Sequence, residues 1–282
     1  MKILVTGATG TVGGHIVRKL QGHKLQGHEV VALVRDPSAA MPAGVTAVTG
    51  TLTDRDDVSR ALEGVDRAFL ILADDSGAVF AQAAAEAGLQ LAVMLSSFTV
   101  DTPLRSGAAN FVTAHHRAGE QALTKAGVPS AFLRAGGFDY NIVPWVAAAR
   151  DDVVRLPYPD MRSPFVDPAD IAASAVALLS AAEPVPGAYS ITGPEAGSLR
   201  EQVAEVNRAF GRSYLVQELG EKETGIGFLD EMPELVRTSF LEVFEGAGQV
   251  TPSDDVRRLT GTPARPFSAW LAENRGAFAV RQ

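Results

Sequence analysis

The first 135 residues alternate short apolar runs with longer stretches of helical character, and this alternation constrains the fold more than any other feature. The apolar runs are rich in Val, Ile, Leu and Phe and lack a strict two-residue alternation, which is typical of strands buried on both faces. Right-handed crossovers would make such strands parallel. We therefore expect an α/β fold with a doubly wound parallel sheet. The expected strands are Ile3–Thr6, Val30–Val34, Val45–Thr49, Arg67–Leu72, Leu91–Leu95 and Ser130–Leu133.

The pattern changes after residue 135, where glycines and prolines interrupt it. Ser198 with Glu201 three residues later forms the signature of a capping box, which predicts a helix running to Phe210. We divide the chain into a first domain of residues 1–135, with 166–192 packing back on it, and a smaller, mostly helical C-terminal lobe of 136–165 and 193–282. The other expected elements are helices at Val12–Gln21, Asp54–Leu62, Ser76–Ala87, Val112–Ala126, Asn141–Arg150, Ala169–Ala181 and Phe267–Phe278, and a strand at Tyr189–Thr192.

Composition excludes several classes of protein. The chain of 282 residues has a formal net charge of −8, which argues against sequence-independent nucleic-acid binding. It has no cysteine, hence no disulfide, cysteine-ligated zinc, iron–sulfur cluster or thiol nucleophile. No apolar run is long enough to span a membrane, and the N-terminus reads as a strand instead of a signal peptide. We expect a cytoplasmic monomer or homodimer without membrane or nucleic-acid partners.

Histidine spacing gives little support to a metal site. The five histidines form no HExxH motif. Leu20-Gln21-Gly22-His23 recurs almost at once as Leu25-Gln26-Gly27-His28. We interpret this as a short tandem duplication that lengthens a loop; a metal-binding histidine pair is the alternative. The expectation is no bound metal.

The strongest motif follows the first strand. Gly7, Gly10 and Gly13 are spaced G-x-x-G-x-x-G between a strand and a helix. Glycine is needed where the backbone must turn sharply, approach a pyrophosphate or let a helix pack closely on a strand. The helix N-terminus then offers free N–H groups to the phosphates. The motif predicts that residues 1–135 form a dinucleotide-binding, Rossmann-type domain and that the smaller lobe binds the substrate.

The end of the second strand discriminates between the two nicotinamide dinucleotides. Arg35 follows the strand directly, and its planar guanidinium suits the 2′-phosphate of NADPH. Asp36 comes next, and it either stabilises the turn before Pro37 or contacts a ribose hydroxyl. These residues favour NADPH over NADH as the cofactor.

In sequence order, these and later segments resemble the NmrA-like, NAD(P)H-binding branch of the atypical short-chain dehydrogenases/reductases. The matching segments are Gly7-Ala8-Thr9-Gly10-Thr11-Val12-Gly13, Leu33-Val34-Arg35-Asp36-Pro37, Ala61-Leu62-Glu63-Gly64-Val65-Asp66, Ser96-Ser97, His116 with Glu120, Leu133-Arg134-Ala135-Gly136-Gly137-Phe138 with Asn141, Ile191-Thr192-Gly193-Pro194-Glu195 and Leu259-Thr260-Gly261-Thr262-Pro263.

This resemblance implies an NADPH-dependent oxidoreductase acting on a ketone, quinone or enone of a small, aromatic metabolite, including secondary-metabolite tailoring. Two alternatives stay open. NmrA-like proteins include non-catalytic redox sensors that bind the dinucleotide and act through protein partners, and a non-redox tailoring or coupling enzyme on a polyketide-like substrate is the other. The candidate cofactor-binding residues are Gly7, Thr9, Gly10, Thr11, Val12, Gly13, Arg35, Leu72 and Ser96.

The usual catalytic motif of short-chain dehydrogenases, Tyr-x-x-x-Lys, is absent. On the corresponding helix His116 and Glu120 are spaced i, i+4 and share a face. A neighbouring carboxylate would raise the pKa of the imidazole, so His116 is the candidate proton donor, with Ser96 helping to polarise the acceptor. The alternative is a pair with a surface or capping role.

Aromatic residues gather in the loop-rich crossing between the two lobes. Such a set could form a lid over a flat aromatic or quinone-like substrate; the alternative is that these side chains are simply core. The candidate substrate-binding residues are Phe138, Tyr140, Asn141, Trp145 and Phe165.

Overall fold

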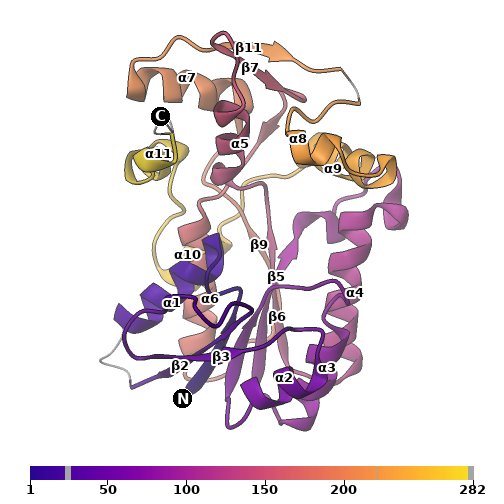
Figure 1. Ribbon diagram of the computed structural model, residues 1–282, viewed down its shortest axis with the longest axis vertical. Coiled ribbons are helices and arrows are strands. Elements are labelled where there is room, and N and C mark those ends of the chain that lie inside the picture. Colours follow the sequence, from indigo (N-terminus) through magenta and orange to yellow (C-terminus); the bar gives the residue numbers. More distant parts are fainter. Residues whose placement is uncertain (23–26, 221, 279–282) are drawn as a thin grey trace.

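A computed structural model describes residues 1–22, 27–220 and 222–278 (Figure 1). The centre of the tandem duplication, residues 23–26, lies outside the described residues, so the interpretation of its histidines stays a prediction. Figure 1 shows a lower domain built around a large sheet and an upper lobe that carries α5, α7, α8, α9 and α11.

The large sheet has seven strands in the order β3-β2-β1-β4-β5-β6-β9, and every neighbouring pair is parallel. The predicted doubly wound parallel sheet is confirmed. Both predicted ends of β2, β5 and β6 fall within a few residues of the observed ones. The strands are β1 (Lys2–Thr6), β2 (Glu29–Val34), β3 (Val45–Thr49), β4 (Arg67–Leu70), β5 (Leu91–Ser97), β6 (Ser130–Ala135) and β9 (Gly187–Ile191).

Helices cover both faces of this sheet, and this explains why its inner strands β1, β2, β4 and β5 are buried almost throughout. Successive residues of β1 point to opposite faces, so Ile3 and Val5 belong to one hydrophobic cluster and Leu4 to another. In Figure 1 the first face carries α1 (Thr11–Gly22), α6 (Pro168–Ser180) and α10 (Asp255–Thr260), and the second carries α2 (Arg55–Ala61), α3 (Ala78–Glu86) and α4 (Phe111–Lys125).

The upper lobe is mostly helical, as predicted, and has its own core around Trp145 and Trp270. Sequence analysis missed two small sheets in this lobe, one parallel (β7 with β11) and one antiparallel (β8 with β10). The helices are α5 (Ile142–Ala147), α7 (Leu199–Phe210), α8 (Gly227–Asp230), α9 (Glu234–Ala247) and α11 (Phe267–Glu273); the strands are β7 (Val153–Leu156), β8 (Arg162–Ser163), β10 (Gly197–Ser198) and β11 (Leu215–Glu218). Short 3₁₀ turns span η2 (Phe98–Val100), η3 (Gly107–Ala109), η4 (Asp139–Asn141) and η5 (Arg275–Phe278).

Helix α7 begins where the sequence predicts. The Ser198 hydroxyl accepts a hydrogen bond from the Glu201 amide at 3.1 Å, and the Glu201 carboxylate accepts one from the Ser198 amide at 2.9 Å. This reciprocal pair satisfies two N–H groups that the helix leaves unpaired. The start of α7 is therefore fixed by local chemistry.

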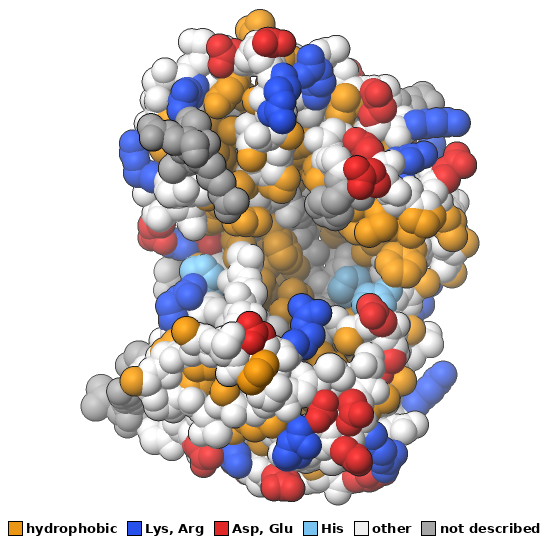
Figure 2. All heavy atoms as spheres, viewed as in Figure 1, with side chains coloured by type: hydrophobic (Ala, Val, Ile, Leu, Met, Phe, Trp, Pro, Cys, Tyr) orange, Lys and Arg blue, Asp and Glu red, His pale blue; other side chains and the backbone are white. Residues whose placement is uncertain are grey.

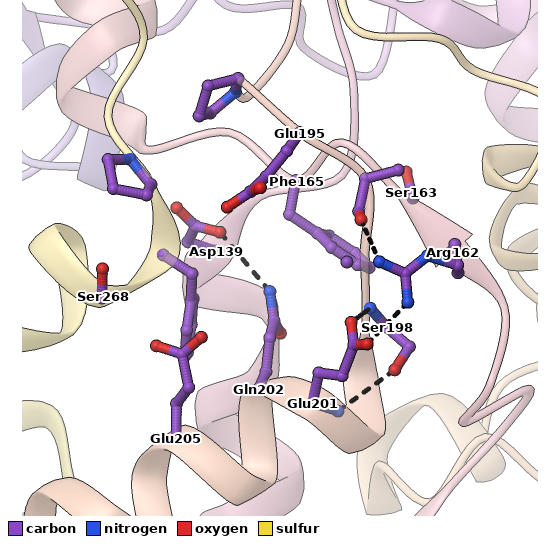
Figure 3. Close-up of a pocket in the computed structure, with 15 residues that line it drawn as sticks. Asp139, Arg162, Ser163, Phe165, Glu195, Ser198, Glu201, Gln202, Glu205 and Ser268 are labelled. Atoms are coloured by element: carbon purple, nitrogen blue, oxygen red, sulfur yellow. Dashed lines mark hydrogen bonds and ion pairs between the residues drawn. The ribbon is translucent and has the colours of Figure 1, made fainter.

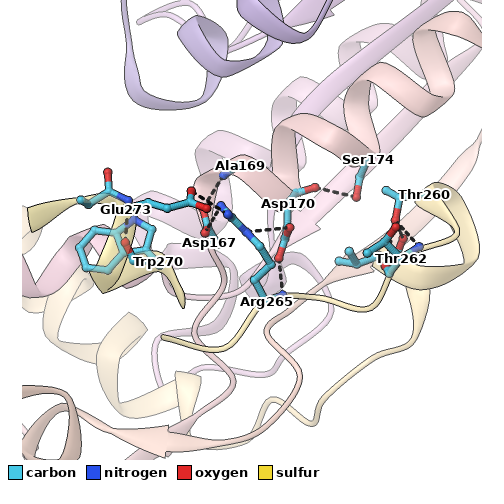
Figure 4. Close-up of polar contacts among 11 residues, drawn as sticks. Asp167, Ala169, Asp170, Ser174, Thr260, Thr262, Arg265, Trp270 and Glu273 are labelled. Atoms are coloured by element: carbon cyan, nitrogen blue, oxygen red, sulfur yellow. Dashed lines mark hydrogen bonds and ion pairs between the residues drawn. The ribbon is translucent and has the colours of Figure 1, made fainter. Parts of the chain in front are cut away.

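Arg265 joins the C-terminal segment to the start of α6 (Figure 4). Its guanidinium pairs with Asp167, the N-cap of α6, and with Glu273 on α11 at 2.7 Å. Its backbone N–H donates to Asp170 at 2.7 Å. One residue thus connects the lower domain to the upper lobe. In the part of the chain that the structure describes, no helix is long and apolar enough to cross a membrane.

Candidate active site

A hollow separates the two lobes, at the end of the large sheet where its strands terminate. Figure 2 shows hydrophobic side chains on its floor and histidine and basic side chains on its rims. In doubly wound sheets, ligands bind at the carboxyl ends of the strands. The glycine turn and α4 both lie at this end of the sheet.

The glycine turn is closely packed. Gly7 has a φ of +61°, which favours glycine, and the Gly10 amide donates to the Gly7 carbonyl at 2.9 Å. A Cβ on Gly13 would lie 2.2 Å from the Gly7 carbonyl oxygen, so only glycine lets α1 approach β1 this closely. The turn therefore keeps the backbone free of side chains where a pyrophosphate would bind.

The N-terminus of α1 completes this cradle. Its first turn contains no acidic residue that could compete with a bound phosphate. Thr9, Gly10 and Thr11 are exposed, whereas Val12 is 3% exposed and packs in the core, so Val12 can offer only its backbone. Free N–H groups and the helix dipole suit an anion here. The residues fit the diphosphate of a dinucleotide.

Arg35 lies just beyond β2, exposed, and forms no ion pair with the rest of the described chain. Asp36 accepts hydrogen bonds from the amide and hydroxyl of Ser38 at 2.8 and 2.7 Å, which lowers the pKa of its carboxyl. The geometry thus favours the turn-stabilising interpretation of Asp36 and leaves Arg35 as the free charge at this position.

Leu72 and Ser96 both contact α4. A Cβ on Gly119 of α4 would lie 2.8 Å from the Leu72 methyl groups. Ser96 is 3% exposed, and its hydroxyl donates to Glu120 at 2.7 Å. Ser96 therefore orients Glu120 in this structure.

Glu120 does not act on His116, contrary to the sequence expectation. Its carboxylate oxygens accept hydrogen bonds from Nε and Nη2 of Arg134 at 2.9 and 2.6 Å. Burial, and secondarily the neighbouring His115, lowers the pKa of His116 to about 4. The imidazole is therefore neutral near pH 7, and the expected upward shift of its pKa is wrong.

His115 and His116 have different surroundings. Nδ1 of His115 lies 3.0 Å from the Ser76 hydroxyl, and its ring stacks on Phe111. Nδ1 of His116 is buried with no hydrogen-bond partner among the described residues. His116 is thus the histidine of this pair with a buried ring nitrogen that has no partner among the described residues.

The candidate substrate residues divide into two sets. Trp145 is 1% exposed and donates from Nε1 to the Thr224 carbonyl at 2.7 Å, and Phe165 is 6% exposed in the same core. For these two the core interpretation of the aromatic cluster holds. Tyr140 is 40% exposed, Asn141 is partly exposed, and Phe138 is partly buried beside the sheet core.

Sequence reasoning missed Asp139, which is 0% exposed between these residues. Burial, followed by the nearby Asp167 and Asp170, raises the pKa of its carboxyl to about 8. It also paired Glu120 with the wrong partner. The available signal was Arg134, a charged residue on the partly buried face of a strand whose other face is buried, which needs a carboxylate nearby.

Comparison with known proteins places the chain among reductases. The profile of the NmrA-like family matches residues 1–266. The (4-alkanoyl-5-oxo-2,5-dihydrofuran-3-yl)methyl phosphate reductase of Streptomyces griseus is 40% identical over 98% of this chain and 99% of its own. The NAD(P)H azoreductase of Xenophilus azovorans is 30% identical over 99% of each chain.

Solved structures share the fold. Quinone oxidoreductase QOR2 of Escherichia coli, complexed with NADPH, superposes with a TM-score of 0.79 at 24% identity, covering 96% of this chain and 99% of that one. The triphenylmethane reductase of Citrobacter sp., complexed with NADP(H), gives a TM-score of 0.77 at 19% identity, over 97% and 99% of the two chains.

Proposed function

This chain belongs to the NmrA-like family, and on that premise we propose that it is an NADPH-dependent reductase of a small, electron-poor conjugated acceptor. The observation that carries the proposal is the glycine turn, where Gly7 and Gly13 leave bare backbone before a helix that has no acidic residue in its first turn. The named relatives supply the reaction class, since both matched over their whole length are reductases.

The acceptor we propose first is an enone of the alkanoyl-dihydrofuranone type. The relative at 40% identity is named for a lactone whose ring carbon–carbon double bond can be conjugated with carbonyl groups. A quinone or an azo compound, named for more distant relatives, is likewise electron-poor and conjugated. Tyr140, Asn141 and Phe138, which border the crossing between the lobes, are the proposed substrate contacts.

In the bound state the nicotinamide supplies a hydride, and the protein supplies position and polarity. The amides of the turn and of the α1 N-terminus hold the diphosphate, and Arg35 holds the 2′-phosphate. His116 donates a hydrogen bond from its neutral imidazole to the acceptor oxygen, which stabilises the charge that develops there. With this pKa the imidazolium is scarce near neutrality, so the proton that completes reduction comes from water.

The test is NADPH consumption with a panel of acceptors: an alkanoyl-dihydrofuranone methyl phosphate, its dephosphorylated alcohol, a benzoquinone and an azo dye. We expect reduction of the furanone ring, with one NADPH used per product and with deuterium from [4-²H]NADPH found in that product. The alcohol shows whether this chain needs the phosphate.

Two other results would each indicate a different function. NADPH binding without turnover of any acceptor would contradict the reductase and favour the non-catalytic sensor. Product formation without net loss of NADPH would instead indicate a non-redox tailoring reaction.

A further inference from the structure

A second pocket lies away from the glycine turn, beside the N-terminal half of α7 (Figure 3). It occupies about 270 Å³ between η4, β8, the segment before α7 and the segment entering α11. Its lining includes Asp139, Ser163 and Gln202, and it contains no residue of the turn and neither Ser96 nor His116. The residues proposed to hold NADPH and to polarise the acceptor therefore lie outside this pocket.

Three buried oxygen atoms in this lining have no hydrogen-bond partner in the described structure: Oδ2 of Asp139, Oγ of Ser163 and Oε1 of Gln202. Asp139 and Ser163 are 0% exposed and Gln202 is 4% exposed. The remaining carboxylate oxygen of Asp139 is 3.5 Å from Nε2 of Gln202, a long contact that Figure 3 shows inside the pocket. Buried acceptors are rarely left unpaired, so these oxygens point to a ligand that donates hydrogen bonds.

The charge of the lining indicates the sign of the ligand's charge. Glu195 and Glu205 also line the pocket, and no basic side chain of the described residues pairs with either. The one basic residue of the lining, Arg162, is held by the Glu201 carboxylate and the Ala196 carbonyl, each at 2.6 Å. The pocket is therefore acidic and lacks a free cation of its own.

We propose that this pocket binds a small organic cation of the primary ammonium class at Asp139, Ser163 and Gln202. An alkylammonium has three N–H donors and one positive charge, which match three unpaired acceptors in an acidic lining. A metal ion fits less well, because no three acidic or histidine side chains within the described residues are placed to hold one. A neutral polyol would leave the lining charge uncompensated.

Binding would change the protonation of Asp139. Asp167 at the N-cap of α6, Asp170 on α6 and Glu205 on α7 are close enough to raise the pKa of this carboxyl further, after burial, while Arg265 acts in the opposite direction. At pH 7 the carboxyl is mostly protonated, since its pKa is about 8. A cation favours the carboxylate, so binding at pH 7 releases a proton.

A ligand in this pocket would also affect the segment that carries the proposed substrate contacts. Asp139 lies in η4 between Phe138 and Tyr140, and its amide donates to the Val166 carbonyl at 3.0 Å. A ligand held by Asp139 therefore fixes the segment that carries the proposed substrate contacts. Binding of the cation does not require turnover of NADPH.

The test is calorimetric titration of the full chain with n-butylammonium, with tetramethylammonium and 1-butanol as probes that lack the N–H donors or the charge. We expect saturable one-to-one binding of n-butylammonium only, with proton release seen by comparing buffers of different ionisation enthalpy. Asp139→Asn and Ser163→Ala should each weaken binding about tenfold or more.

The control variant is Asp160→Asn, which removes an exposed carboxylate paired with Arg200 outside the pocket and should leave binding unchanged. NADPH affinity reports that each variant is folded. Equal heats from n-butylammonium and tetramethylammonium, no saturable heat at millimolar n-butylammonium, or unchanged binding by folded Asp139→Asn and Ser163→Ala would each overturn the proposal.

Discussion

Arg134 on β6 donates from two of its nitrogens to the two carboxylate oxygens of Glu120 on α4, at 2.9 and 2.6 Å. Ser96 on β5 donates to the same carboxylate, and Arg134 also pairs with Asp101. These contacts join α4 to two adjacent strands of the sheet. Because His116 lies one turn before Glu120 on α4, the same contacts fix where the candidate catalytic imidazole sits.

Arg134→Met should cost about 3 kcal/mol of unfolding free energy, because it leaves the buried Glu120 carboxylate without its cation and with only the Ser96 hydroxyl as a partner. Urea denaturation measures the loss. The matched control is Arg55→Met, which breaks an ion pair of similar length with Glu86 whose side chains are more than half exposed. That change should have little effect, since exposed pairs contribute little. Equal losses in the two variants would contradict a structural role for the buried pair.

Gly13→Ala should abolish NADPH binding. Its Cβ would meet the Gly7 carbonyl oxygen at 2.2 Å, so the turn or the start of α1 must move. Gly14→Ala, one residue later, places a Cβ 3.4 Å from the Ala8 carbonyl oxygen and should be tolerated. Calorimetry gives both affinities, and circular dichroism checks the fold. If Gly13→Ala bound NADPH with wild-type affinity, the turn would not be part of the cofactor site.

Arg35→Ala should weaken NADPH binding about tenfold to a hundredfold and leave NADH binding unchanged, because a charged hydrogen bond to the 2′-phosphate is lost. Arg257→Ala on α10 removes the same charge from another exposed position and serves as the control. Fluorescence titration with each coenzyme measures the ratio of affinities. An unchanged ratio in Arg35→Ala would rule out this arginine as the determinant of coenzyme choice.

His116→Ala should lower kcat/KM about a hundredfold, as expected when one donor to a developing oxyanion is removed. His116→Gln, which can still donate an N–H, should retain most of the activity. If His116 instead donated a proton as an imidazolium, His116→Gln would be as impaired as His116→Ala. The kcat/KM values of the two variants against the same acceptor distinguish these mechanisms.

Acid stability should also depend on His116. Its pKa is lowered from 6.5 to about 4 in the folded protein, so the unfolded chain binds a proton first as the pH falls. Stability is therefore present above pH 6.5 and is lost as the pH falls from 6.5 towards 4. His116→Gln should lose less over this window in thermal melts. His15 and His115, whose pKa values burial also lowers, add to this loss, whereas Asp139, whose pKa burial raises to about 8, favours the folded state as the pH falls and acts in the opposite direction.

Much of the fold could be predicted from local signals. Buried strands such as β1 and capped helices such as α7 have patterns that depend on neighbouring residues alone. The pairs β7–β11 and β8–β10 could not, because each joins short segments dozens of residues apart. Their residues carry no distinctive periodicity, and only tertiary packing brings them together.

The sequence indicates the part of the candidate site that depends on backbone conformation. It indicates less about side chains whose partners are distant in sequence. Gly7 and Gly13 indicate their role through spacing alone. Glu120 could pair with His116 by helical spacing, yet Arg134 on a neighbouring strand takes it. Likewise nothing around Asp139 in the sequence indicates that α6 and α7 bury it beside other acidic residues.

The most direct test of coenzyme binding is calorimetric titration of the wild-type protein with NADPH and with NADH. We expect one coenzyme per chain and an NADPH affinity at least about tenfold higher than that for NADH. Absence of binding by either coenzyme at millimolar concentration would contradict the assigned turn, and with it the reductase.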